Sequence, residues 1–294
     1  MSFAIPLQTI RTLPVARLLV GVGVFVVVTC TCASSAFASI YSAAVLADNP
    51  VSYWQLNETS GTTALDSADG NNGANTSITT GVAGLVGDAY GFNGSSSRVG
   101  MGNPANLNFG TTGAFSLEAV FKWDGGGDMV HNIIRKSNFP SPPGSGYWLR
   151  ILRDSETLEF FTGETTGVAG IRGSVATTIS PDVWYHAVGT RDSAGLMSLY
   201  VNGVLVDTTS VPGADTTSSA PFVLGAWDDI FGIIEHYDGT IDDVAVYDYA
   251  LSSGAVAAHA NASVIPEPSS LLVFGGLALC FGLAARRRRR RHAA

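Results

Sequence analysis

Side chains rich in oxygen gather in two parts of the sequence and could bind a hard cation. One is the segment Asp66–Gly73, with the sequence DSADGNNG, and the other holds Asp238, Asp242 and Asp243. Calcium is bound by several oxygens from carboxylates, amides and backbone carbonyls. Both segments supply such oxygens, although the spacing is not that of an EF-hand loop. The alternative stays open, because Asp, Asn and Gly also favour tight turns without any metal.

The sequence lacks the familiar catalytic patterns. It has no Gly-x-Ser-x-Gly elbow, no Gly-x-x-x-x-Gly-Lys loop and no His-Glu-x-x-His motif. Its nearest acid pairs, Glu156 with Glu159 and Asp242 with Asp243, have odd spacing, so on a strand the two side chains are expected on opposite faces. Retaining glycoside hydrolysis needs two carboxyls about 5–5.5 Å apart. We therefore expect no enzyme activity, with a divergent glycoside hydrolase as the weaker alternative.

Three aromatic positions beside polar residues are candidates for a sugar-binding platform. Trp148 follows Tyr147, Trp227 precedes Asp228, and Tyr237 lies further along the chain. An amphipathic aromatic ring near polar groups is typical of ligand sites. The predicted ligand-binding residues are therefore Trp148, Trp227, Asp228 and Tyr237. The alternative is that these rings belong to the core, as most aromatic side chains do.

Short strands separated by turn residues are expected to position these groups. Between residues 39 and 240 no long helical periodicity occurs, and runs of alternating or β-branched residues are broken by Gly, Asn, Asp and Pro. The predicted strands lie near Val51–Leu56, Ala89–Phe92, Ser97–Met101, Phe115–Trp123, Asn132–Lys136, Tyr147–Leu152, Thr157–Thr162, Ser174–Thr178, Trp184–Thr190, Leu196–Val201, Val204–Thr209, Phe222–Ala226 and Gly239–Tyr247.

The segment LMSLYVNGVLVDTT predicts a hairpin. Asn202-Gly203 supplies the two positive-φ residues of a type I′ turn. Met197, Leu199 and Val201 are expected to face away from Tyr200 and its alternating neighbours. Many short strands at this spacing predict an all-β sandwich or jelly roll, and only Leu251–Asn261 suggests a helix.

Five motifs occur in a fixed order along the chain: DNPVSYWQLNETSGTTALDSADGNNGA, GFNGSSSRVGM, FSLEAVFKW, WYHAVGTRD with LMSLYVNGVLV, and DGTIDDVAVYDYALSSGAVAAHA. In this order they resemble a laminin-G-like (LamG) domain of the concanavalin A-like jelly-roll superfamily, over nearly all of residues 45–262. The resemblance implies a jelly-roll β-sandwich of two antiparallel sheets over residues 39–263. It also implies a structural calcium (Ca2+) that ties the first and last strands together, with ligands from Asp66, Asp69, Asn71 and Asp242 or Asp243.

The N-terminal segment is typical of a secretory signal peptide. Arg11 and Arg17 precede the apolar run 18–28, and an Ala-x-Ala pattern ends at Ala38. We therefore predict export, with residues 1–38 removed after Ala38. The three cysteines all lie in the terminal segments, so the central domain has no disulfide and depends on its core.

The C-terminal segment 264–294 has three parts in sequence. Pro266-Glu267-Pro268 is followed by the uncharged, mostly apolar run 271–285 and then by the arginine cluster 286–291. The run would form a membrane helix of about 22 Å, and the arginines would keep its end cytoplasmic. This segment resembles the PEP-CTERM sorting signal, which implies recognition by an exosortase, cleavage near the Pro-Glu-Pro motif, and transient insertion in the inner membrane of a Gram-negative-type bacterium.

The net charge of the central domain indicates which classes of partner to expect. Residues 39–265 hold 8 of the 16 Lys and Arg residues but 23 of the 24 Asp and Glu residues, a net charge of −15. So acidic a domain is not expected to bind nucleic acid. The sequence therefore predicts an exported protein of the cell envelope, cell surface or extracellular matrix that binds glycans, such as extracellular polysaccharide, or other surface partners. A structural matrix protein without a specific ligand is the alternative.

Overall fold

The structure is a computed structural model that describes residues 40–137, 144–165, 172–229 and 232–263. The predicted signal peptide, the Pro-Glu-Pro motif, the apolar run and the arginine cluster all lie outside the described residues. Within the described ranges, no helix combines the length and the apolar character needed to span a bilayer.

The first of two large antiparallel sheets has eight strands in the described part of the chain. Strand β1 (Ser52–Trp54) lies off the main path and pairs with β18. The other strands follow the order β14 (Val204–Ser210), β13 (Leu196–Val201), β12 (Trp184–Arg191), β7 (Phe115–Trp123), β18 (Asp238–Tyr247), β5 (Asp88–Asn93) and β4 (Thr79–Ala83).

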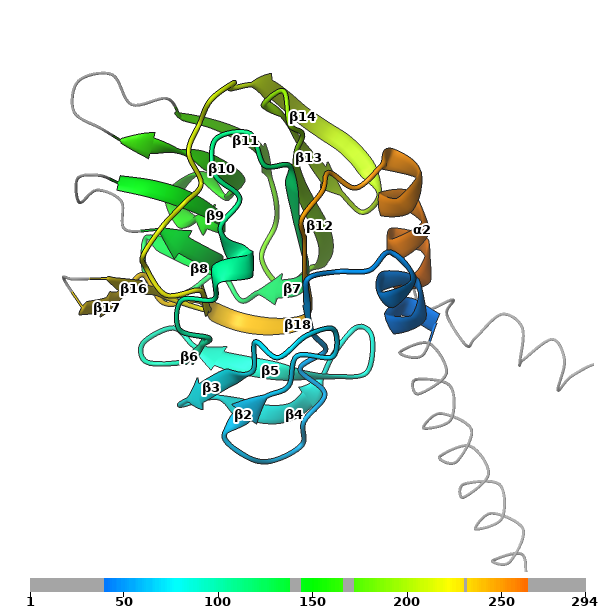
Figure 1. The fold of residues 1–294 in the computed structure, drawn as a ribbon. Coiled ribbons are helices and arrows are strands. Elements are labelled where there is room, and N and C mark those ends of the chain that lie inside the picture. The colour runs from blue at the N-terminus through cyan, green and yellow to red at the C-terminus, as the bar shows by residue number, and fades with distance from the viewer. Residues whose placement is uncertain (1–39, 138–143, 166–171, 230–231, 264–294) are drawn as a thin grey trace, which may run out of the picture.

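The second sheet also has eight described strands, all paired antiparallel. Their order is β11 (Arg172–Thr178), β10 (Thr157–Thr165), β9 (Gly144–Leu152), β8 (Val130–Ser137), β15 (Val223–Leu224), β6 (Arg98–Gly100), β3 (Gly73–Thr76) and β2 (Thr63–Ala64). The two sheets face one another (Figure 1), an arrangement consistent with a jelly-roll sandwich. The predicted all-β fold of two antiparallel sheets is thereby confirmed.

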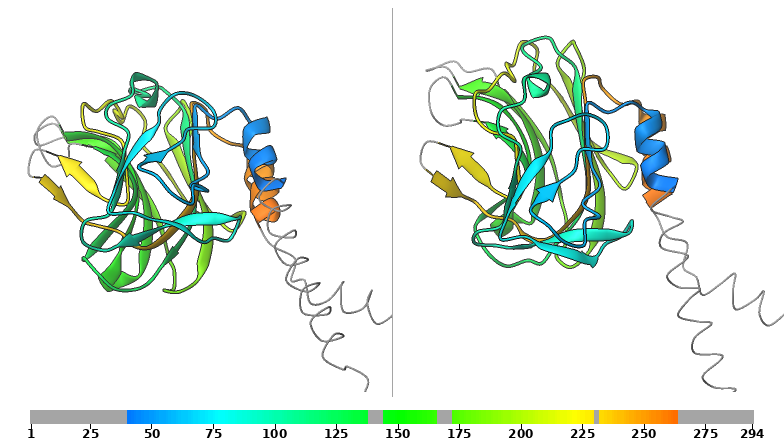
Figure 2. Two further views of the ribbon diagram at one scale, coloured as in Figure 1. Left: turned by 90° about the horizontal axis from the view of Figure 1, so that it is seen from below. Right: turned by 60° about the horizontal axis from the view of Figure 1, so that its bottom comes forward.

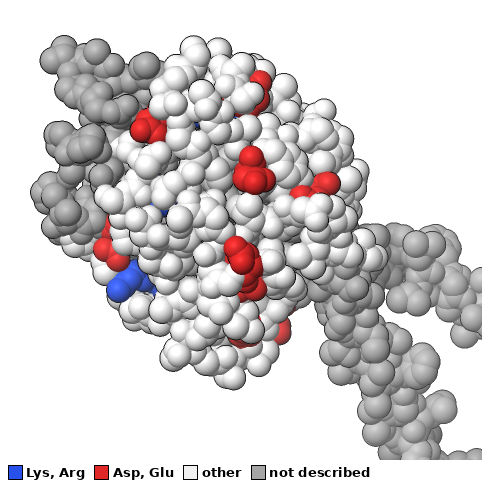
Figure 3. All heavy atoms as spheres, in the orientation of Figure 1, with Lys and Arg blue, Asp and Glu red and all other residues white. Residues whose placement is uncertain are grey.

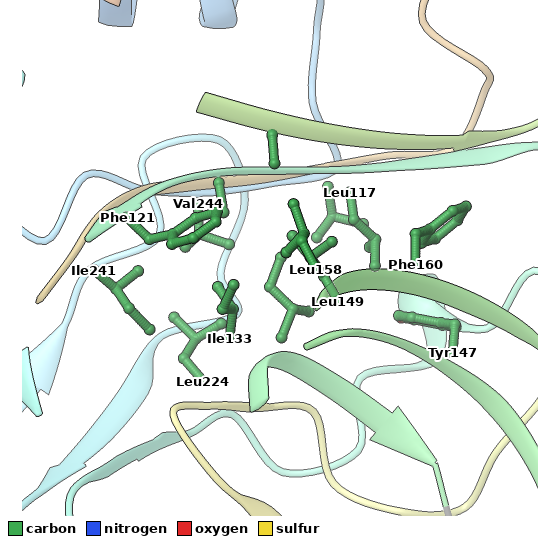
Figure 4. Packing of buried hydrophobic residues seen from close by; sticks show 14 of the residues in the cluster. Leu117, Phe121, Ile133, Tyr147, Leu149, Leu158, Phe160, Leu224, Ile241 and Val244 are labelled. Carbon is green, nitrogen blue, oxygen red and sulfur yellow. The ribbon is translucent and has the colours of Figure 1, made fainter. Parts of the chain in front are cut away.

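The core fills the space between the sheets (Figure 4). Alternate residues of β7 point inward, as the sequence pattern predicts, so that Leu117 and Phe121 meet Leu149 and Phe160 of the second sheet. The same alternation in β18 directs Val244 into this core. Further buried members include Trp54, Trp123, Tyr147, Ile151, Phe222, Leu224 and Tyr237.

The β13–β14 hairpin has the predicted turn. Val201 pairs with Val204, and Asn202 and Gly203 have φ angles of 50° and 80°. Met197 lies in the core between the sheets, whereas Tyr200 packs on the outer side of the first sheet. A one-residue shift in register would reverse this assignment, so the turn and the burial pattern agree.

The outer side of the first sheet is covered by the two ends of the described chain. A helix over residues 40–47 and helix α2 (Ser253–Ser263) lie side by side there (Figure 2). Tyr41 and Val256 belong to a second hydrophobic cluster on this outer side. Helix α2 was predicted, and the N–H of Ala255 donates to Oγ of Ser252 (3.1 Å) as an N-terminal cap. The helix over 40–47 was not predicted.

The outer side of the second sheet carries a small hairpin of its own. Strands β16 (Trp227–Asp229) and β17 (Gly232–Ile234) pair only with each other among the described strands. The 3-10 helices η1 (Ala105–Leu107) and η2 (Arg153–Ser155) connect strands elsewhere. The β16–β17 hairpin, β3 and β4 were absent from the sequence prediction. These strands are short, several contain glycine, and their sequences alternate only weakly between apolar and polar residues.

Candidate functional site

The predicted calcium loop is organised by a single carboxylate. Oδ1 of Asp66 accepts the N–H of Tyr53 (2.8 Å) and of Asp69 (3.2 Å), and Oδ2 accepts the N–H of Asn71 (3.2 Å). The side chain of Asn106 then joins Oδ2 of Asp69 (3.0 Å) to the amide of Asn71 (3.2 Å). The three loop residues named from the sequence are therefore brought together, but by hydrogen bonds within the protein.

Asp242 and Asp243, the other two predicted calcium ligands, lie on the outer side of the first sheet. Tyr53 contacts both groups, because its N–H donates to Asp66 and its phenol donates to Asp243. The five predicted ligand residues do not form one set, because Asp66 binds the backbone of this tyrosine and Asp243 binds its phenol at the far end of the side chain. Nor does any cluster of three or more His, Cys, Asp or Glu within the described ranges have the arrangement of a metal site. Calcium binding stays a prediction.

A β-bulge in β18 corrects the prediction that Asp242 and Asp243 face opposite sides. Ile241 pairs with Phe121 and Val244 with Ala119, so two residues of β18 oppose one of β7. Both carboxyls therefore lie on the same outer side, and they contact each other. Odd spacing separates side chains only where the strand is regular.

The bulge creates a buried acid pair. Asp242 accepts the N–H of Val86 (2.8 Å), while one oxygen of each carboxyl has no partner among the described residues. Burial, followed by the charge of Asp242, raises the pKa of Asp243 well above its usual value. Burial also raises the pKa of Asp242, to about 6. Burial of two neighbouring carboxyls thus favours their protonated forms, which lowers the cost of enclosing them.

A third carboxylate on this outer side, that of Glu118, is fully buried and fully hydrogen-bonded. Its oxygens accept the hydroxyls of Tyr41 (3.0 Å) and Tyr247 (2.8 Å), Nε2 of His186 (2.7 Å) and Nδ1 of His259 (3.1 Å). Burial alone would raise the pKa of Glu118, but the hydrogen bonds from the two histidines outweigh it and hold that pKa well below its usual range. The lowered pKa favours the anionic form of Glu118 at neutral pH.

The donors to Glu118 come from four separate elements. Tyr41 is on the helix over 40–47, His186 on β12, Tyr247 on β18 and His259 on α2. Nε2 of His259 also lies 3.1 Å from Oδ2 of Asp48. Burial lowers the pKa of His259, but the hydrogen bond to Glu118 reverses this effect and raises it. This cluster fixes both terminal helices to the sheet.

The outer side of the second sheet encloses a cation instead. Neighbouring strands place Arg135 of β8 opposite Trp148 of β9, and Trp148 opposite Phe161 of β10. The guanidinium of Arg135 lies 4.7 Å from the ring centroid of Trp148 and 3.9 Å from that of Trp227, and Trp148 stacks on Phe161 at 3.7 Å. Cation–π attraction therefore holds the β16–β17 hairpin against the sheet. We call these residues and Arg150 the arginine–tryptophan row.

Two glutamates complete the arginine–tryptophan row. Oε2 of Glu159 accepts Nε of Arg150 (2.7 Å) and Nε1 of Trp148 (3.1 Å). Oε2 of Glu235 accepts Nη1 of Arg135 (3.0 Å). Side chains of both glutamates remain partly exposed, at 14% and 23%. Polar groups at the edge of the row are thus accessible, whereas the rings are covered.

A groove of about 630 Å³ borders this row. The groove lies between the start of β8 and the β16–β17 hairpin, and it shares Glu235 with the row. Met129 and Ile234 expose 63% and 39% of their surface there. Its lining comprises Asp128, Met129, Val130, Ile233, Ile234, Glu235 and His236. An open groove with apolar side chains and a few convergent polar groups has the composition of a ligand-binding site.

The family model for the concanavalin A-like lectin/glucanases superfamily (Laminin_G_3) matches residues 93–257, more than half of the chain. The chain belongs to this superfamily. In this LamG domain the match includes the first sheet's central strands, the arginine–tryptophan row and the β16–β17 hairpin. The resemblance expected from the sequence motifs is thereby confirmed at the level of the family.

Solved structures similar to the LamG domain include receptor-binding domains of botulinum neurotoxins. The C/D mosaic domain is 17% identical with a TM-score of 0.55, and the alignment covers 73% of this chain and 51% of that one. The DC binding domain in complex with SialylT is 16% identical with a TM-score of 0.55, covering 74% and 52%. This likeness shows the fold, and the chain spans about half the length of these structures. No curated protein matches the chain.

The structure places the predicted ligand-binding residues of the LamG domain in different surroundings. Trp148 and Trp227 are brought together around Arg135, but both side chains are buried, so neither is the exposed platform that was predicted. Asp228 lies in β16 of the same hairpin. Tyr237 as a surface platform is wrong, because its ring is fully buried in the core against Phe92, 5.9 Å away.

Several residues of both outer faces were not predicted from the sequence. Arg135, Arg150 and Glu159 of the row, and Glu118 of the buried cluster, were not named as site residues. A signal for one of them is present, because Arg150 lies two residues after Trp148 and therefore on the same face of β9. Glu118 has no such signal, since a carboxylate in an alternating strand ordinarily faces solvent.

Proposed function

We propose that this protein is a non-catalytic, glycan-binding LamG module that is exported and displayed at the cell envelope or in the extracellular matrix. The observation that carries the proposal is the groove between β8 and the β16–β17 hairpin, which offers apolar and polar side chains on one accessible surface. The lectin/glucanase superfamily of the domain supports it. Among the solved structures of similar fold is one of botulinum neurotoxin type C, whose cell entry depends on interaction with two ganglioside molecules.

The chemistry of the groove favours a neutral, hydroxyl-rich glycan. Asp128 and Glu235 supply carboxylate oxygens, which accept hydrogen bonds from sugar hydroxyls. Met129 and Ile234 supply the apolar surface on which a sugar ring lies. The domain as a whole is acidic, and its visible surface carries scattered acidic side chains with few basic ones (Figure 3). Polyanionic glycans would be repelled.

The buried acids do not support a hydrolase. Glu118, Asp242 and Asp243 are almost fully enclosed beneath the terminal helices. Glu118 is bound by four donors, and Asp243 by Tyr53. None of these acids is part of the lining of the groove. An acid that serves hydrolysis must reach the glycosidic oxygen, so we assign these acids a structural role.

The test of glycan binding is an array of neutral and uronic-acid polysaccharides probed with the full-length protein, followed by calorimetry on each glycan that binds. Asp128→Asn and Met129→Ala are expected to weaken binding of a neutral glycan about tenfold each. The matched control is Val204→Ala, because Val204 is 64% exposed on the first sheet and outside the groove. If no glycan binds, the protein is a structural matrix component. If both groove variants bind like the wild type, the groove is not the site.

Export and sorting are the second part of the proposal. Residues 1–38 and 264–294 would act as address signals, with an exosortase-type protease cleaving near Pro266-Glu267-Pro268 after transient membrane insertion. Mass spectrometry of the protein isolated from its native cells tests this. We expect a mature N-terminus at Ser39 and loss of the arginine cluster. An intact chain recovered from the cytosol would contradict the assignment.

A further inference from the structure

A second concave site lies on the first sheet, on the other side of the sandwich from the groove. Its volume is about 310 Å³. It is formed where the last turn of α2 approaches β12 and the β13–β14 turn. The lining residues are Leu85, Trp184, His186, Asn202, Ala260, Asn261 and Ser263. Ligand pockets start at about 300 Å³, so this pocket suits one small molecule rather than a chain of sugar rings.

The imidazole of His186 gives the pocket an unused hydrogen-bonding atom. Its Nε2 lies 2.7 Å from Glu118, and the residue is only 2% exposed. Because a carboxylate accepts but does not donate, Nε2 must carry the proton. In the Nε2–H tautomer Nδ1 is an acceptor, and it has no partner among the described residues. Buried polar atoms without a partner are rare, and because His186 is part of the pocket lining, a ligand in the pocket would be the source of a donor.

Asn202 is positioned as a donor at the same pocket. Its backbone and side chain both bind His186, because its N–H donates to the carbonyl of His186 (2.8 Å) and its Oδ1 accepts the N–H of His186 (3.0 Å). The oxygen of the amide is therefore occupied, and its nitrogen stays available for a ligand. Gly203 next to it has a φ of 80° and lies close under α2, which fixes the turn against the helix.

The remaining lining residues are apolar or uncharged, and Nζ of Lys122 lies 5.9 Å from the ring centroid of Trp184. Trp184 supplies an aromatic surface and packs on the outer hydrophobic cluster, with part of its side chain exposed. Asn261 is exposed on α2 and offers a second amide. The lining contains no Lys, Arg, Asp or Glu. An uncharged ligand with hydroxyl groups and one apolar face matches this combination, because it can stack on the indole and donate to His186.

We propose that this pocket is a second binding site, which takes a single neutral pyranose ring with one hydroxyl donating to Nδ1 of His186. Glu118 acts on the ligand through His186, since it holds the imidazole in the tautomer that accepts. The site lies on the opposite sheet from the groove and is formed by different residues, so it does not depend on the glycan-binding function proposed there.

The experiment is ligand-observed saturation-transfer NMR and calorimetry on the full-length protein with methyl glucoside, methyl galactoside and N-acetylglucosamine. Glucuronate is the charged counterpart. We expect at least one neutral sugar to bind and glucuronate to bind at least tenfold more weakly. Trp184→Ala and Asn261→Ala are expected to reduce the affinity tenfold or more. Ser253→Ala, at the opposite end of α2, is the matched control and should bind like the wild type.

A direct readout on His186 separates ligand binding from a structural effect of the variants. The side-chain nitrogen spectrum should show the Nε2–H tautomer of His186, with its Nδ1 resonance shifting when the neutral sugar is added. The proposal is overturned if none of the three neutral sugars binds, or if binding persists unchanged in both Trp184→Ala and Asn261→Ala. Asp128→Asn in the groove should leave this binding intact, so the two sites succeed or fail separately.

Discussion

The two outer faces of the sandwich enclose charges of opposite sign by different means. On the first sheet the anion of Glu118 is surrounded by hydrogen-bond donors from two tyrosines and two histidines. On the second sheet the cation of Arg135 lies between the rings of Trp148 and Trp227. A carboxylate needs donors for its lone pairs, whereas a guanidinium can use the negative faces of aromatic rings as well as a carboxylate.

The covering segments also differ between the two faces. The first face is closed by the helix over 40–47 and by α2, which come from the two ends of the domain. The second is covered only in part by the β16–β17 hairpin, which leaves the groove beside it. The comparison indicates that the first face secures the ends of the chain and that the second presents a binding surface. Four experiments test this contrast.

The largest effect is expected from Glu118→Gln. The amide keeps the shape of the side chain but removes the buried negative charge that accepts hydrogen bonds from two tyrosines and two histidines. We expect a loss of about 3–5 kcal/mol in the free energy of unfolding, measured in urea. Glu159→Gln is the control, because its ion pair with Arg150 is partly exposed, and it should cost about 1 kcal/mol or less. Equal losses in both variants would remove the distinction between the faces.

Arg135→Met tests the cation on the second sheet. The variant removes the guanidinium from between two indole rings and leaves Glu235 without its ion-pair partner. Because Glu235 is partly exposed, we expect a smaller loss than for Glu118, about 2–3 kcal/mol. Tryptophan fluorescence should shift to the red as Trp227 gains contact with water. Arg135→Lys should recover little of the loss, since an ammonium cannot stack between the rings, and full recovery would contradict the proposed geometry.

The pH dependence of stability should reflect the first face. The depressed pKa of Glu118 means that the unfolded chain takes up a proton as pH falls below its usual value of 4.5, so stability decreases there, by up to about 1.4 kcal/mol per pH unit. The raised pKa of His259 contributes stability below 6.5 that is lost as pH rises above it. The raised pKa of Asp242 contributes stability below 3.8 that is lost as pH rises to about 6.

Melting temperatures between about pH 3 and pH 8 test these signs. The acidic decrease caused by Glu118 should be absent in Glu118→Gln and present in Glu159→Gln. The alkaline decrease caused by His259 should also flatten in Glu118→Gln, because the hydrogen bond to the Glu118 carboxylate raises that pKa. An acidic decrease of the same size in Glu118→Gln would place its origin outside this cluster.

The smallest effect is expected from Gly203→Ala. The φ of 80° at Gly203 is costly for alanine, and an added Cβ would lie 3.0 Å from Cβ of Ala260 on α2. We expect a loss of about 1 kcal/mol and weaker docking of α2. Gly100→Ala is the matched control, since its Cβ would meet no atom within 4 Å. If hydrogen exchange in α2 is the same in both variants, this turn does not support the helix.

Regular alternation made much of the fold predictable. Strand Phe115–Trp123 has the predicted bounds, and the Asn202-Gly203 turn has the predicted conformation. Both depend on residues close together in the chain. The prediction failed at Asp242 and Asp243, where the bulge in β18 turns both carboxyls to one side. A bulge is a property of two paired strands, so neither strand shows it alone.

The candidate sites were predictable only in part for the same reason. The sequence drew attention to Trp148 and Trp227, but the arginine between them comes from a third strand. Tyr237 has the same kind of neighbours in the sequence as an exposed ring, yet the segment just before β18 directs it into the core. The neighbours of a side chain along the chain do not reveal its neighbours across a sheet.

The sequence by itself determined the all-β class, the hairpin turn at Asn202-Gly203, the family and the acidic character of the domain. These follow from local alternation, turn chemistry and composition, which are written residue by residue. Only the tertiary structure decided that Glu118 would be a buried anion bound by elements as distant as residues 41 and 259. It also decided that the groove and the pocket would lie on opposite faces. The physical reason is that burial and hydrogen-bond partners arise from pairing between remote segments, which no local pattern encodes.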